Sequence, residues 1–174
     1  MNVTMFLASS LNGIIARPDY SEDFLSREHW ESFLECAKRT GAVIWGRRTH
    51  ERVRVFSRDY LDRMWELEKI VVTRSPDFDP GKGFELAESP RQALELLESR
   101  GAKEVTLAGG SVLNTAFVQE KLVDEVILNI EAVIVGEGIS LLAPDAADLR
   151  LAPNPEFRRL SERIVQLRYG VLKS

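Results

Sequence analysis

The sequence has little cysteine and little histidine. Its 174 residues include one cysteine, Cys36, and two histidines, His29 and His50. A single cysteine excludes an intramolecular disulfide and a cluster of thiolate ligands. The histidines show no HxxxH spacing, so a zinc site would depend on carboxylates. We therefore expect no bound metal. Cys36 lies in a helical pattern and is interpreted as a small core residue rather than as a nucleophile.

Long apolar runs and an excess of positive charge are also missing. No apolar run approaches the roughly 18 residues of a membrane-spanning helix, and the N-terminus lacks the basic region of a signal peptide. The formal net charge of -4 disfavours a nucleic-acid binder. We expect a soluble, cytoplasmic protein that contacts neither membrane nor nucleic acid. A composition with 44% hydrophobic and 29% charged residues argues against disorder, and the length indicates one domain, residues 1–174.

Apolar strand patterns alternate with helical patterns up to residue 122. The predicted strands are 2–9, 42–45, 69–73 and 105–108, and the predicted helices follow Ser26, Gly46, Ser89 and Gly110. The second of these helices is expected to continue through Val53 and Phe56. This order predicts parallel strands joined by right-handed crossovers.

The last third of the chain shows strand patterns without the alternating helices. A long strand with alternating apolar residues is predicted from Val126 to Ile134, followed by strands at 157–160 and 165–171 that we expect to be antiparallel. The predicted fold is a doubly wound α/β sheet, mostly parallel, with antiparallel C-terminal strands. One face of the long strand carries Ile127, Asn129, Glu131 and Val133, a mixed surface suited to a cleft wall or to a partner subunit. This face and the antiparallel tail are both suited to isologous pairing, so we expect a homodimer.

Two glycines separate a predicted strand from a predicted helix. Gly109 and Gly110 follow the strand at 105–108, and Ser111, which opens the helix, is a candidate N-cap. Glycines leave no Cβ to block a ligand that lies across the backbone, and the helix start offers free N–H groups and a positive dipole. The combination suits a phosphate or pyrophosphate. The alternative is a tight turn that binds nothing.

Arginines and hydroxyls follow two other predicted strands. Gly46-Arg47-Arg48-Thr49 follows one strand, and Thr73-Arg74-Ser75 follows the next. Because ligands of such sheets bind beyond the carboxyl ends of the strands, these residues predict a polyanion site, and arginine forks suit a 2′-phosphate. No GxGxxG is present, which excludes the Rossmann fingerprint. A single arginine in such a position is more often a solvated or salt-bridged surface side chain, but three arginines at successive strand ends favour ligand binding.

These motifs resemble those of the dihydrofolate-reductase-like family. The resemblance is to the reductase domain at the C-terminal end of bacterial bifunctional riboflavin-biosynthesis deaminase-reductases and their stand-alone relatives, and it covers essentially the whole chain. It rests on the following segments: 10–16 (SLNGIIA), 46–49 (GRRT), 72–74 (VTR), 109–111 (GGS), 122–125 (LVDE) and 133–138 (VIVGEG).

The resemblance implies a reductase that uses NADPH. Residues Gly46, Arg47, Arg48, Thr49, Thr73, Arg74 and Ser75 would hold the adenosine phosphates, and Gly109, Gly110, Ser111, Val112 and Leu113 the pyrophosphate. Ala8 and Ile15 would flank the nicotinamide. The implied substrate is a pyrimidine- or pterin-like heterocycle or its ribosylamino precursor, as for a 5-amino-6-(5-phosphoribosylamino)uracil reductase.

The substrate half departs from the family pattern. The family's Asp is Asn12 here, and the Glu that often precedes the two glycines is Ala108. We assign substrate contact to Asn12 and Glu131 as candidate catalytic residues, with the helix carboxylate Glu31 as a weaker candidate beside Trp30. Loss of both family carboxylates leaves two alternatives open: a nucleotide-binding module without turnover, and a structural dimeric domain.

Overall fold

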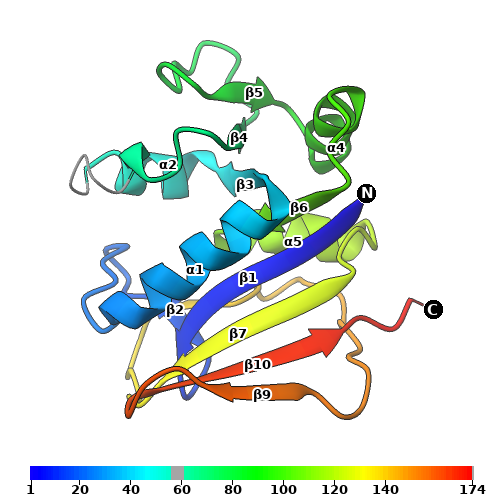
Figure 1. Cartoon of the computed structure of the whole chain (residues 1–174). Coiled ribbons are helices and arrows are strands. Elements are labelled where there is room, and N and C mark those ends of the chain that lie inside the picture. Colours follow the sequence, from blue (N-terminus) through cyan, green and yellow to red (C-terminus); the bar gives the residue numbers. More distant parts are fainter. Residues whose placement is uncertain (56–60, 174) are drawn as a thin grey trace.

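An eight-stranded sheet runs through the computed structural model, which describes residues 1–55 and 61–173 (Figure 1). Its strands, in spatial order, are β5 (Glu85–Ala87), β4 (Glu68–Val72), β3 (Ala42–Gly46), β6 (Glu104–Leu107), β1 (Asn2–Ser10), β7 (Glu125–Glu131), β10 (Ile164–Gly170) and β9 (Glu156–Arg159). The pairs from β5 to β7 are parallel, whereas β10 runs antiparallel to both β7 and β9. A short ribbon of β2 (Ile14–Ala16) and β8 (Ile139–Ser140) lies beside the sheet.

Helices cover both faces of the sheet. Alternation along β3 sends Ala42 and Ile44 into one core, with α4 (Pro90–Ser99) and α5 (Ser111–Gln119). Val43 and Trp45 enter the other core, with α1 (Arg27–Thr40) and α2 (Arg47–Val53). The doubly wound α/β fold with antiparallel C-terminal strands is thus confirmed. None of the helices in the described part of the chain combines the length and apolar character that crossing a membrane requires.

Several helix ends are set by capping residues next to them in the sequence. The Ser89 side chain caps α4 by accepting a hydrogen bond from the Gln92 backbone N–H at 3.3 Å, and Pro90 occupies the first turn. Gly41, with φ of 74°, closes α1 in the left-handed conformation. The prediction that Ser111 caps α5 is wrong, because Gly110 is the N-cap and Ser111 is the first helical residue.

The strand predicted from Val126 to Ile134 ends early, at Glu131. The Val133 backbone N–H donates to the Glu131 carbonyl at 2.7 Å, which turns the chain out of the sheet. The side chain of Asn12 then satisfies the backbone of Val135, accepting from its N–H at 3.0 Å and donating to its carbonyl at 2.8 Å. A side-chain amide therefore replaces the pairing that a longer strand would have made.

Other differences concern short elements. β5 and β8 were not predicted, because strands of three and two residues carry no readable alternation. Helix α2 ends at Val53, and the predicted continuation to Phe56 lies outside the described residues. The mixed face of β7 is covered by its own chain, since Ile127, Asn129 and Glu131 are all buried, so this face cannot be the predicted partner surface.

Candidate functional site

The carboxyl ends of β3 and β6 bring the two glycine motifs together. The Gly46 N–H donates to the Gly109 carbonyl, and the Ala108 N–H donates to the Ile44 carbonyl, both at 2.8 Å. The Gly109–Gly110 peptide bond is cis, and Gly109 has φ of 85°, a conformation that favours glycine. A Cβ on Gly110 would lie 3.3 Å from Thr49 Oγ1. The glycine turn therefore faces the start of α2 closely enough that a larger residue at Gly110 would press on Thr49.

The predicted residues at the ends of β3 and β4 also meet. The Arg47 guanidinium donates to Ser75 Oγ at 3.0 Å and to Glu51 Oε1 at 2.8 Å, and it lies over the ring of Phe78, 5.1 Å from the centroid. The Ser75 N–H donates to Thr73 Oγ1 at 3.1 Å. These contacts hold one arginine and two hydroxyls at a single edge of the sheet.

The remaining predicted cofactor residues are spread around this edge. Arg48 donates to the Tyr20 hydroxyl at 2.9 Å and lies over the Tyr20 ring. Arg74 is exposed, and no other described residue forms a hydrogen bond or ion pair with its side chain. Val112 is 68% exposed on the first turn of α5, whereas Leu113 is buried and packs 3.7 Å from the Cβ position of Gly46.

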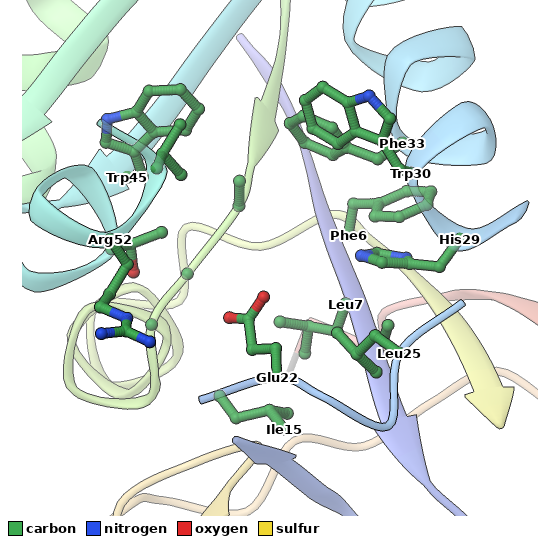
Figure 2. Close-up of a pocket in the computed structure, with 16 residues that line it drawn as sticks. Phe6, Leu7, Ile15, Glu22, Leu25, His29, Trp30, Phe33, Trp45 and Arg52 are labelled. Carbon is green, nitrogen blue, oxygen red and sulfur yellow. The ribbon is translucent and has the colours of Figure 1, made fainter. Parts of the chain in front are cut away.

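A pocket opens next to the glycine turn, between α1, α2 and β1 (Figure 2). Five of the predicted cofactor residues line it, namely Ala8, Ile15, Thr49, Gly109 and Gly110. The sequence also indicated Trp30 and Ala108 for the substrate side, and both line the pocket, but the rest of the lining was not predicted. The aromatic part of the lining consists of Phe6, Trp30, Phe33 and Trp45. Flat, largely apolar walls beside a few polar groups are the usual composition of a small-molecule site.

Two opposite charges face this pocket. Arg52 lies three residues after Thr49 on α2, and its Nε is buried without a hydrogen-bond partner. Glu22 comes from the loop before α1; much of its side chain is exposed, yet its carboxylate points into the pocket (Figure 2). Desolvation of the carboxylate by the surrounding protein raises the pKa of Glu22, and the positive charge of Arg52 partly offsets the rise. Helical spacing from Thr49 could have revealed Arg52, but no sequence signal marks Glu22.

His29 forms part of the opposite wall. Its ring stacks on Phe6 with centroids 5.9 Å apart, and its Nδ1 lies 3.3 Å from the side-chain nitrogen of the buried Asn129. The Asn129 side-chain oxygen in turn accepts from Gln166 at 2.9 Å. Burial lowers the pKa of His29 to about 4, so the ring is neutral near pH 7. Its position four residues before Phe33, on one helix face, could have indicated that it points inward.

The low pKa of His29 makes stability depend on pH. Between the unfolded pKa of 6.5 and the folded value of about 4, the unfolded chain binds a proton that the folded chain does not, so stability falls as pH falls through this window. We expect wild type to lose about 2 kcal/mol more than His29→Gln between pH 7 and pH 5. Urea unfolding of both proteins at the two pH values measures this difference. Equal losses would contradict a buried neutral imidazole.

The candidate catalytic residues Asn12 and Glu131 do not line the pocket. Asn12 is bound to Val135, as described above, and Glu131 Oε1 accepts from both the N–H and the hydroxyl of Ser26 at 2.8 Å. Both side chains therefore fix the segments that frame the pocket. The weaker candidate Glu31 forms a bidentate pair with Arg63, with both distances 2.8 Å, and also lies outside the pocket. Ala108, in contrast, lines the pocket with its small side chain.

Comparison with known proteins places this geometry in a family. Residues 1–164 match the family model of the RibD C-terminal domain. The uncharacterized protein YwjB of Bacillus subtilis (strain 168) is 30% identical over 174 residues, with 95% of each chain covered.

Solved structures share the fold at lower identity. A pyrimidine reductase-like protein of Corynebacterium diphtheriae has a TM-score of 0.79 at 14% identity, with 99% of this chain and 92% of that chain covered. The riboflavin biosynthesis reductase Rib7 of Saccharomyces cerevisiae has a TM-score of 0.70 at 15% identity, with 98% and 90% covered. The family match over 1–164 and this shared fold lead to one conclusion: the chain belongs to the RibD C-terminal domain family.

Proposed function

We propose that the protein is an NADPH-dependent reductase that acts on a small pyrimidine- or pterin-like heterocycle or its ribosylamino precursor. The observation that carries the proposal is the joining of two surfaces: the Gly109–Gly110 turn at the start of α5 opens directly into the aromatic pocket. A reductase needs such a junction, because cofactor and substrate must lie in contact. The similarity to proteins whose names describe riboflavin biosynthesis and pyrimidine reductases supports the same reaction class.

The residues at the sheet edge fit NADPH. Gly110 and Ser111 are partly exposed at the start of α5, and the glycine turn lines the pocket, so backbone N–H groups there would be available to a pyrophosphate. Arg47, with Ser75 beside it, and the exposed Arg74 would bind the adenosine phosphates, including a 2′-phosphate. Bound NADPH would supply the hydride. Ala8 and Ile15 would flank its nicotinamide and exclude water from that side.

The pocket walls would orient the substrate against the cofactor. Phe6, Trp30 and Phe33 form an apolar wall against which a flat heterocycle would pack. Asn12 and Glu131 would act as positioning residues, because each fixes a segment that borders the pocket. A ring of small size fits this role better than an extended polymer does.

Titration with NADPH and NADH in parallel, followed by tryptophan fluorescence, tests the proposal. We expect NADPH to bind at least tenfold more tightly than NADH, because only NADPH carries the 2′-phosphate. Oxidation of NADPH in a screen of pterins and aminouracils would then identify the substrate. Tight binding without oxidation across the screen would favour the nucleotide-binding module. If neither nucleotide binds, the reductase proposal is wrong.

Of the two surfaces assigned to a homodimer from the sequence, the mixed face of β7 is buried, which leaves the antiparallel C-terminal strands. The outer strand β9 is exposed along its length, with Phe157 67% exposed. We propose that two copies pair through β9 and β10. Sedimentation at micromolar concentration tests this, and a monomer there would contradict it.

A further inference from the structure

Two complementary charges face the pocket without meeting each other. No salt bridge within 4.0 Å joins Glu22 to Arg52, and within residues 1–55 and 61–173 the Glu22 carboxylate accepts no hydrogen bond. Arg52 Nε is buried and also has no hydrogen-bond partner among these described residues. Figure 2 shows both side chains directed at the same space, one from the loop before α1 and one from α2. The space between them is therefore bounded by an acceptor on one side and a donor on the other.

An unpaired buried donor is unfavourable in a folded protein, and such groups persist where a ligand completes them. The Arg52 Nε–H needs an acceptor, and its fixed position on a helix defines where that acceptor must lie. The Glu22 carboxylate needs a donor, since a carboxylate only accepts hydrogen bonds. A ligand in this pocket must then present one donor and one acceptor on the same edge.

The charges also exclude simpler ligands. A phosphate group beside Glu22 would be repelled, and an organic cation beside Arg52 would be repelled equally. The aromatic side chains Phe6, Trp30 and Phe33 favour a planar, uncharged ring. The ligand ring should therefore be planar and neutral, with a hydrogen-bond donor next to an acceptor. A cyclic amide has these properties, because its ring N–H lies next to its carbonyl.

This inference rests on the proposed function and adds specificity residues to it. We infer that Glu22 and Arg52 together read the cyclic amide edge of the substrate ring, with the Glu22 carboxylate accepting from the ring N–H and the Arg52 guanidinium donating to the neighbouring carbonyl oxygen. The pair selects rings with that edge. Methylation of the ring nitrogen removes the donor and places a methyl group against a carboxylate.

Binding of pterin, measured by its fluorescence with and without saturating NADPH, tests this pair against 3-methylpterin. Wild type should bind pterin at least tenfold more tightly than 3-methylpterin. Glu22→Gln and Arg52→Gln should each weaken pterin binding tenfold or more and reduce the discrimination. Glu28→Gln and Arg54→Gln are matched controls, because both side chains are exposed and neither lines the pocket. They should bind pterin as wild type does.

NADPH affinity, measured on every variant, separates the possible failures. Unchanged NADPH affinity in Glu22→Gln and Arg52→Gln shows that fold and cofactor surface are intact. If NADPH binds but pterin and 3-methylpterin bind equally, or if the two variants bind pterin as wild type does, the inference is wrong and the proposed function stands. If NADPH fails to bind wild type, the proposed function fails, and the pterin comparison without NADPH still decides the role of the pair.

Discussion

Gly138→Ala is expected to destabilise the protein by about 2–4 kcal/mol. A Cβ on Gly138 would lie closer than 3 Å to two atoms, the Ala16 carbonyl oxygen and Ile14 Cγ2. Both belong to β2, whose backbone is paired with β8 and cannot retreat without breaking that ribbon. Gly138 does not have a positive φ, so the expected effect is steric rather than conformational. Chemical denaturation of the purified variant measures it.

Gly136→Ala provides the matched control for this substitution. Its Cβ would meet no atom within 4 Å, although it lies in the same connection between β7 and β8. Both substitutions restrict the unfolded chain alike, so this contribution cancels in the comparison. We expect Gly136→Ala to change the free energy of unfolding by less than about 0.5 kcal/mol. Equal effects of the two substitutions would show that β2 does not pack against Gly138 as described.

The fold could be predicted because its signals are local. β3 illustrates this: four successive apolar residues, Ala42 to Trp45, serve two cores on opposite faces, and such continuous runs are typical of buried parallel strands. The end of β7 could not be predicted in the same way. It depends on Asn12, which bonds Val135 across 123 positions of the sequence. No sequence signal near Val133 indicates that Asn12 will bind this segment.

In the candidate site, too, the features with local sequence signals could be predicted and those that depend on distant residues could not. The glycine turn and the GRRT segment could be found because strand ends and helix starts lie next to each other in sequence, and parallel pairing then brings Gly46 to Gly109. The pocket walls could not be found, since Glu22 comes from an irregular loop. Glu131 was expected to face a cleft, yet its carboxylate is occupied by Ser26, 105 residues away. A buried acid and a pocket acid look alike in sequence.

Replacing Arg47 and Arg74 together by alanine is expected to weaken NADPH binding by tenfold or more. Charge-assisted hydrogen bonds contribute roughly 1.5–3 kcal/mol each, and Arg47 is already oriented by Ser75, Glu51 and Phe78, so little side-chain freedom would be lost on binding. Arg74 has no described partner to give up. Fluorescence titration of the double variant with NADPH gives the affinity directly.

The nucleotide without the 2′-phosphate distinguishes a specific contact from a general loss of positive charge. If Arg47 and Arg74 bind that phosphate, NADH affinity should change much less than NADPH affinity, so the preference for NADPH should collapse. Arg91→Ala is the control, because Arg91 is exposed on α4 and pairs with Glu120 at 2.8 Å, away from the glycine turn. If the double variant loses affinity for NADPH and NADH equally, the two arginines act only through their charge. If its NADPH affinity is unchanged, Arg47 and Arg74 do not belong to the cofactor site.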